Sequence, residues 1–176
     1  HKNNELIYKK FFAEDVRYPI YTTTKTITSA AIGIAKSEGK ISEDDFLCDY
    51  LEKKYLELLS EKQLENFRKL TIKRFLTMSV DGFPFRPSGD DWIEFSLLSN
   101  DDFGRSPKFS YSNISAYFVG VACENAVGKP LYDYINEKIF EPLNIPNPPY
   151  KTCPKGHFYG ATGMELTVDE LSRTGR

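Results

Sequence analysis

Histidine and cysteine are scarce in this sequence of 176 residues, which contains two histidines and three cysteines. His1 and His157 have no neighbouring cysteine or acidic residue at the spacing of metal ligands, so the sequence predicts no metal site and disfavours a Ser-His-Asp triad. We interpret His157 as a polar loop residue rather than a base. An odd number of widely spaced cysteines fits neither a disulfide framework nor a CxxC clamp, and we expect free, mostly buried thiols.

The sequence also lacks an excess of one charge and a long apolar run. Its 23 Lys and Arg residues are scattered among 25 Asp and Glu residues, which indicates neither a nucleic-acid nor an anionic-membrane partner. No stretch approaches the ~20 apolar residues of a membrane span, and the start has no signal-peptide core. Because the first residue is not Met, we expect a trimmed start, which leaves the compartment undetermined. No glycine-rich phosphate motif is present, so no cofactor is implied.

The chain has the composition of a folded domain, with 40% hydrophobic and 14% aromatic residues, and we expect a single domain over 1–176. Residues 5–12 predict a strand, while 22–38 carry apolar side chains at 3.6-residue spacing, which predicts a helix that ends at Gly39. Further helix starts are indicated at Ser42 with Asp45, Thr71, Asp90 or Asp91, Ser112 or Asn113, Pro130, and the capping box Thr167 with Glu170.

Thr22 and Lys25 stand at the start of the predicted helix. A hydroxyl in the first turn lies at the positive end of the helix dipole, and a lysine three residues later lies on the same face. If packing desolvates the amine, it can take the hydroxyl proton and make the oxygen a nucleophile without any histidine. The alternative is that Thr22 only caps the helix and Lys25 is solvated.

Tyr111 and Asn113 form the second candidate, directly before another helix. A phenol and a carboxamide that alternate along the chain can point into one cleft, where Tyr111 would shuttle a proton and Asn113 would hold a substrate amide. The alternative is a buried aromatic at Tyr111 and a helix cap at Asn113.

Several blocks in a fixed order resemble one family. Residues 21–45 read YTTTKTITSAAIGIAKSEGKISEDD, which resembles the nucleophile region of the penicillin-recognising serine hydrolases, the superfamily of class C β-lactamases, DD-peptidases and related esterases. The matching blocks that follow are LTIKRFLTMSVDGF, then KFSYSN with a Y-x-N motif, then INEKIFEPLNIP, and last YGATGMELTVDELSR. The resemblance covers nearly the whole chain.

The resemblance implies a role for each motif residue. Thr22 occupies the place of the serine nucleophile, Lys25 that of the motif lysine, and Tyr111 and Asn113 those of the Y-x-N pair. In that family the serine is acylated by an amide or ester carbonyl, Lys and Tyr handle protons, and water or another acceptor releases the acyl group. Backbone N–H groups, including that of the nucleophile, would meet the oxyanion.

Two departures from the family pattern bear on activity. Threonine replaces serine at position 22, and its extra methyl stiffens χ1 and crowds the line of attack. The family's third motif, a Lys- or His-Thr-Gly strand edge, is absent, since Arg173-Thr174-Gly175 ends the capped helix instead. We therefore expect an α+β fold of the β-lactamase/DD-peptidase type, mainly its helical subdomain (22–176), with one N-terminal strand and loop (1–21) and an incomplete antiparallel sheet.

Three functional hypotheses follow. The first is a hydrolase, or the N-terminal part of one, that acts on a β-lactam, a peptidoglycan-like peptide or a small ester. The second is a non-catalytic relative that binds a peptide or small ligand, because Thr22 replaces the nucleophile. The third is a helical interaction module without cleft chemistry, which the paired motifs disfavour. The substrate and the oligomeric state are not readable from the sequence.

Overall fold

A computed structural model describes residues 2–3 and 5–175. The helices are α1 (Thr24–Ser37), α2 (Lys53–Leu56), α3 (Glu61–Phe67), α4 (Ile72–Leu76), α5 (Trp92–Leu98), α6 (Asn113–Val127), α7 (Leu131–Ile135) and α8 (Val168–Thr174). Single helical turns are the 3₁₀ segments η1 (Tyr21–Thr23) and η2 (Leu47–Tyr50) and the π segment η3 (Asn136–Phe140). The strands are β1 (Tyr18–Pro19) and β2 (Glu165–Leu166).

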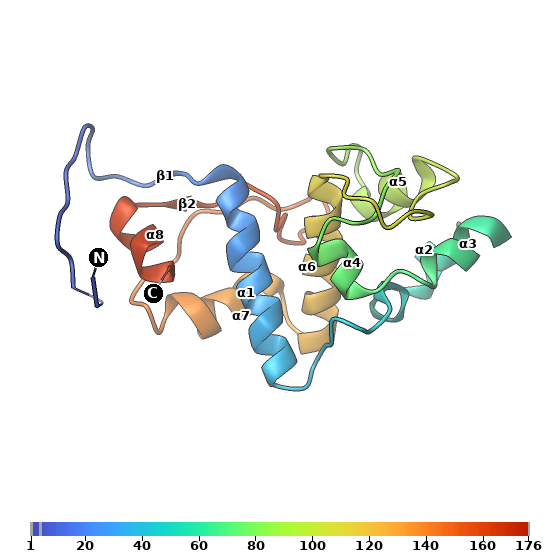
Figure 1. Ribbon diagram of the computed structural model, residues 1–176, viewed down its shortest axis with the longest axis horizontal. Coiled ribbons are helices and arrows are strands. Elements are labelled where there is room, and N and C mark those ends of the chain that lie inside the picture. Colours follow the sequence, from blue (N-terminus) through green and yellow to red (C-terminus); the bar gives the residue numbers. More distant parts are fainter. Residues whose placement is uncertain (1, 4, 176) are drawn as a thin grey trace.

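Helices α1 and α6 run side by side through the middle of the molecule (Figure 1). Ile27, Ala31 and Ala35 recur at helical spacing on α1 and are buried, as the periodicity predicts. Helix α6 is buried on all sides from Asn113 to Cys123, because α1, α4 and η2 each pack against it. The two helices that begin at the candidate motifs are therefore held together by the core.

The small sheet pairs β1 with β2 in antiparallel register, Tyr18 opposite Leu166 and Pro19 opposite Glu165. The fold is thus mostly helical with a two-stranded antiparallel sheet, which agrees with the predicted class. The predicted strand at 5–12 is wrong. That segment crosses beside α8 and forms only an isolated bridge between Lys2 and Glu5 (Figure 1). Alternating β-formers make a strand only where a partner edge is available.

The remaining predicted helix starts are largely confirmed. The helix over 22–38 is present as η1 and α1, and Gly39 follows it with a φ of 70°. Asp91 and Ser112 are the side-chain caps of α5 and α6, and Thr167 and Glu170 form a complete capping box at α8. Thr71 precedes α4 without a side-chain cap bond, Pro130 is one residue before α7, and Ser42 with Asp45 forms a turn before η2.

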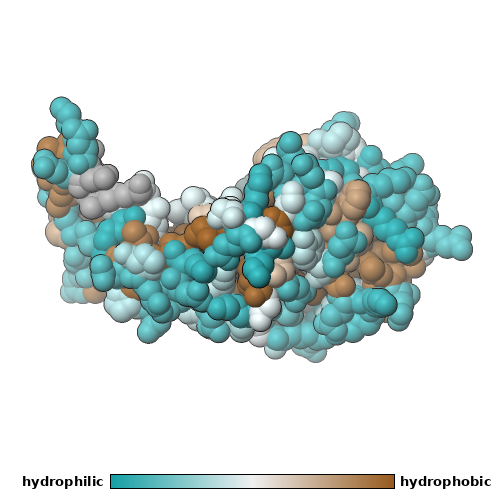
Figure 2. All heavy atoms as spheres, turned by 90° about the horizontal axis from the view of Figure 1, so that it is seen from below, coloured by the Kyte–Doolittle hydropathy of each residue, from teal (hydrophilic) through white to brown (hydrophobic). Residues whose placement is uncertain are grey.

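Hydrophilic residues cover most of the face shown in Figure 2, and apolar residues gather there in separate patches. Several large apolar side chains of the N-terminal segment are exposed, among them Ile7, Tyr8 and Phe12. Within the described ranges, no helix is long and apolar enough to cross a membrane.

Candidate active site

The amine of Lys25 joins both predicted motifs. It donates to Asn113 Oδ1 at 2.7 Å and to the carbonyl oxygen of Ala161 at 2.8 Å, and its Nζ lies 5.1 Å from the centre of the Tyr111 ring. Lys25 is only partly exposed. The interpretation of Lys25 as a solvated surface residue is therefore wrong, since its head group is fixed by two hydrogen bonds and one aromatic face.

Tyr111 and Asn113 reach the lysine because the chain enters α6 in an extended conformation. Ser112, not Asn113, caps α6: its Oγ accepts from the Ile114 N–H and donates to the Pro84 carbonyl. Asn113 is then free to turn its carboxamide toward Lys25 while 5% exposed. Tyr111 is 41% exposed, so the interpretation of this residue as a buried aromatic is also wrong.

Thr22 lies in η1, one turn before the lysine, with an exposed side chain. It makes no side-chain cap bond to the helix, so a purely capping role is wrong, and no hydrogen bond joins it to Lys25 among the described residues. Backbone N–H groups in the first turn have no partner within a helix. Tyr21, directly before it, has a φ of 47°, a left-handed conformation that is strained for an aromatic residue and is typical of functional sites.

Ala161 was not predicted as a site residue. It follows a short hairpin in which Thr152 bridges Phe158 and the Tyr159 N–H donates to the Lys151 carbonyl. Gly160 turns the chain toward α1 with a φ of 67°, and its carbonyl accepts from the Thr28 hydroxyl at 2.8 Å. The glycines at 160 and 163 were a visible signal of a turn, but a backbone carbonyl leaves no residue-type signature in a sequence.

A small, mainly apolar pocket and a buried tyrosine lie beside the Lys25 junction. A pocket of about 40 Å³ is lined by Lys25, Thr28, Ser29, Phe75, Leu76, Met78, Ala116 and Val119. Tyr159 is buried beside Asn113; burial raises the pKa of the Tyr159 phenol, while its hydrogen bond to Asn113 opposes that shift. The site thus combines an amine, a carboxamide and two phenols at one junction of α1, α6 and the hairpin.

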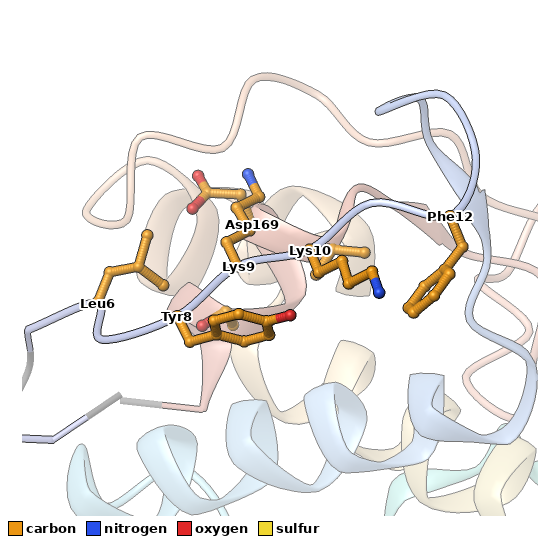
Figure 3. Close-up of a pocket in the computed structure, with 8 residues that line it drawn as sticks. Leu6, Tyr8, Lys9, Lys10, Phe12 and Asp169 are labelled. Carbon is orange, nitrogen blue, oxygen red and sulfur yellow. The ribbon is translucent and has the colours of Figure 1, made fainter.

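A larger pocket, of about 490 Å³, lies between the N-terminal segment and α8 (Figure 3). Its lining is formed by Leu6, Tyr8, Lys9, Lys10, Phe12, Val168, Asp169 and Ser172. None of the four predicted site residues lines it, and its lining combines apolar side chains with Lys9, Lys10, Asp169 and Ser172. The two predicted motifs therefore meet at the Lys25 junction and not in this pocket.

The structure describes no group of His, Cys, Asp and Glu side chains that could hold a metal ion. The three cysteines are free and buried, as expected. His157, interpreted from sequence as a polar loop residue, lies in the loop of the hairpin, and its Nδ1 lies 2.6 Å from Glu124 Oε1. The partner was missed because it is 33 positions away. His1 is outside the described residues.

The Beta-lactamase family model matches residues 2–175 of this chain. Two curated relatives are the putative D-alanyl-D-alanine carboxypeptidases of Escherichia coli O157:H7 and of Escherichia coli strain K12. Each is 24% identical over an alignment of 190 positions, which covers 88% of this chain and 43% of the relative. The chain therefore spans less than half the length of the curated relatives it matches.

Solved structures share the fold. A β-lactamase/D-alanine carboxypeptidase from Yersinia pestis, complexed with citrate, superimposes with a TM-score of 0.69 at 20% identity, covering 92% of this chain and 53% of that one. FmtA from Staphylococcus aureus gives a TM-score of 0.71 at 16% identity, with coverage of 91% and 50%. The family match spans almost every residue, and the solved folds agree with it. The chain belongs to the Beta-lactamase family.

Proposed function

We propose that this chain carries the nucleophile side of an acyl-transfer hydrolase site, which takes an amide or ester through a covalent acyl-enzyme. The substrate class is a β-lactam, a peptidoglycan-like peptide or a small ester, in keeping with relatives described as D-alanyl-D-alanine carboxypeptidases. The observation that carries the proposal is the fixed amine of Lys25, bound to Asn113 and Ala161 one turn after the Thr22 hydroxyl.

In this proposal Thr22 is the nucleophile and Lys25 the base. The Thr22 oxygen bonds to the substrate carbonyl carbon as its proton passes to the Lys25 amine, whose other N–H groups stay on Asn113 and Ala161. The first-turn N–H of Thr22 receives the oxyanion. Tyr111 relays the proton to the leaving group as the bond to it breaks, and water then releases the acyl group. Asn113 also holds the substrate amide.

The alternative is a non-catalytic relative in which the same cleft binds a peptide or small ligand. It is favoured by the Thr22 side chain itself, because a secondary hydroxyl with a stiff χ1 approaches a carbonyl less easily than serine does. The hydrolase and the binding protein would use the same contacts of Lys25. They differ only in whether Thr22 can be acylated.

Intact mass spectrometry after incubation with a fluorophosphonate and, separately, with a penicillin separates the two. We would compare the protein with Thr22→Ser and Thr22→Ala, and use Thr23→Ala as the matched control, since Thr23 is an exposed threonine of the same turn without a side-chain cap bond. An adduct on the protein, on Thr22→Ser and on Thr23→Ala, but not on Thr22→Ala, supports the hydrolase. An adduct on Thr22→Ser alone supports the binding protein, and no adduct on any form contradicts both the nucleophile and the intact cleft.

A further inference from the structure

Two stacked aromatic rings connect Lys25 to an arginine. The Lys25 Nζ lies 5.1 Å from the Tyr111 ring centre, Tyr111 and Phe85 stack with centroids 6.0 Å apart and planes at 29°, and the Arg86 guanidinium lies 5.4 Å from the Phe85 ring. Tyr111 and Phe85 are 41% and 48% exposed. Their rings therefore form an open surface that leads away from the reacting centre, not part of the buried core.

The backbone on which Phe85 and Arg86 stand is tied to the Y-x-N motif. The Ser112 hydroxyl donates to the Pro84 carbonyl at 2.9 Å, and the Asn113 N–H donates to the Phe85 carbonyl at 3.0 Å. Phe83, two residues earlier, is buried and stacks on Phe118 of α6. These contacts tie the loop to the start of α6 and hold Phe85 beside Tyr111.

The charge of Arg86 is not neutralised within the part of the chain that the structure describes. The Arg86 side chain is exposed, and no carboxylate forms an ion pair or a hydrogen bond with its guanidinium. The positive charge of Arg86 also opposes the rise in the pKa of the Tyr159 phenol that burial causes. Arginine with its donors free is suited to bidentate binding of a carboxylate.

We propose that Phe85 and Arg86 form a substrate subsite, in which Arg86 binds a carboxylate on the acyl part of the substrate and Phe85 packs against the chain between that carboxylate and the reacting carbonyl. The inference rests on the proposed function, because it takes Lys25 as the reacting centre. The Tyr111 and Phe85 rings lie between the Lys25 amine and the Arg86 guanidinium. The carboxylate that Arg86 binds is therefore distant from the carbonyl that is attacked, and it belongs to an extended acyl chain such as an acidic peptide.

The test uses two short peptide thioesters that differ only in Glu or Gln two residues before the reacting carbonyl. Acylation rate constants would be measured by intact mass on the protein, on Arg86→Gln, and on Arg68→Gln, an exposed arginine of the α3 terminus that likewise forms no ion pair among the described residues. We expect Arg86→Gln to slow acylation by the Glu thioester about tenfold, as for loss of one charge-assisted pair, and to change the Gln thioester less than about twofold. Arg68→Gln should change neither.

Equilibrium binding of the matching unreactive peptide amides separates failure of this subsite from failure of the proposed function. If no thioester acylates the protein but Arg86→Gln weakens the Glu amide selectively, the hydrolase proposal fails and the subsite stands. The subsite would be overturned if Arg86→Gln lost equal affinity for the Glu and Gln peptides, if it lost no affinity for either, or if the protein bound neither amide. Arg86→Lys should keep part of the preference, because the charge remains and the bidentate geometry is lost.

Discussion

The Lys25 amine donates to the backbone carbonyl of Ala161, 136 positions later in the chain, at 2.8 Å. This bond joins the first turns of α1 to the hairpin that precedes β2. Asn113 at the start of α6 supplies the second acceptor. An amine held by three separate elements keeps one position when side chains around it change, which is the preorganisation that a base requires.

Replacing Lys25 by alanine should abolish covalent labelling at Thr22 while the fold persists. In the proposed mechanism the alanine removes the group that takes the hydroxyl proton. Because the lysine is only partly buried, the cost to stability is small compared with the loss of the proposed base. The measurement is adduct mass with a fluorophosphonate, together with circular dichroism. Lys36→Ala is the matched control, because Lys36 lies in the last turn of the same helix and pairs with Glu43. Labelling that survives in Lys25→Ala removes Lys25 from the mechanism.

Replacing Glu170 by glutamine should destabilise the sheet end of the molecule. Arg17 beside β1 donates to both carboxylate oxygens of Glu170, at 2.6 to 3.2 Å, while its Nη2 also reaches the Pro146 carbonyl. Glutamine keeps the capping geometry at α8 and removes the charge, so we expect a loss of about 2 kcal/mol, or roughly 4–8 °C in Tm, at pH 7. Glu57→Gln, at an exposed glutamate that forms no ion pair with any described residue, should leave Tm within about 1 °C.

The ion pair between Arg17 and Glu170 also predicts that the stability of the fold falls in acid. The hydrogen bonds from Arg17 lower the pKa of Glu170 below its ordinary value of 4.5. A carboxyl with a lower pKa in the folded state contributes stability above pH 4.5, and this contribution is lost as the pH falls toward the folded-state pKa. The difference in Tm between the protein and Glu170→Gln should therefore shrink below pH 4.5. A difference in Tm that stays constant down to pH 3 would show that the charge of Glu170 does not stabilise the fold.

The contact between His157 and Glu124 predicts a pH dependence of the opposite sign, in which stability falls as the pH rises. The hydrogen bond to Glu124 raises the pKa of His157 above its ordinary value of 6.5, with Glu52 and Asp91 adding smaller favourable fields. The stabilisation is complete below pH 6.5 and is lost as the pH rises through the folded-state pKa. For a partly exposed pair we expect about 1 kcal/mol or less, or 2–4 °C in Tm. Glu124→Gln should flatten this decline above pH 6.5, and an unchanged decline would mean that other groups cause it.

Local sequence signals predicted α1, α4, α5, α6, α7 and α8 and the side-chain caps of α5, α6 and α8, but they missed α3 and its Ser60–Gln63 capping box. Ser112 and Asp91 cap the helices that they precede, and the periodic apolar residues of α1 are buried. These features depend on neighbours within four residues, where residue type and spacing determine the contacts.

Pairings over long distances were not predictable from the same signals. The strand was expected at 5–12 because β-formers alternate there, yet the pairing formed at Tyr18–Pro19, where β2 offers an edge. His157 likewise found Glu124 through packing of the hairpin on the end of α6. Partners that are chosen by tertiary packing leave no trace in a short window of sequence.

Replacing Gly160 by alanine tests whether the hairpin positions the Lys25 amine. Gly160 has a φ of 67°, and a Cβ there would meet the Ala116 carbonyl oxygen at 3.2 Å and the Thr28 hydroxyl at 3.4 Å. The turn must then shift away from α1 and α6, which moves the neighbouring Ala161 carbonyl off the Lys25 amine. We expect acylation to fall about tenfold or more, since small displacements of a catalytic group are costly.

The control for this variant is Gly156→Ala in the same hairpin, where the φ is 91° and nothing lies within 4 Å of an added Cβ. Both variants carry the strain of a left-handed alanine, about 1 kcal/mol, and Gly160→Ala adds the close contacts with Ala116 and Thr28. Only Gly160→Ala pushes against the elements that bear Lys25 and Asn113. Acylation rates that fall equally in the two variants would mean that hairpin stability, and not the position of the Ala161 carbonyl, controls the amine.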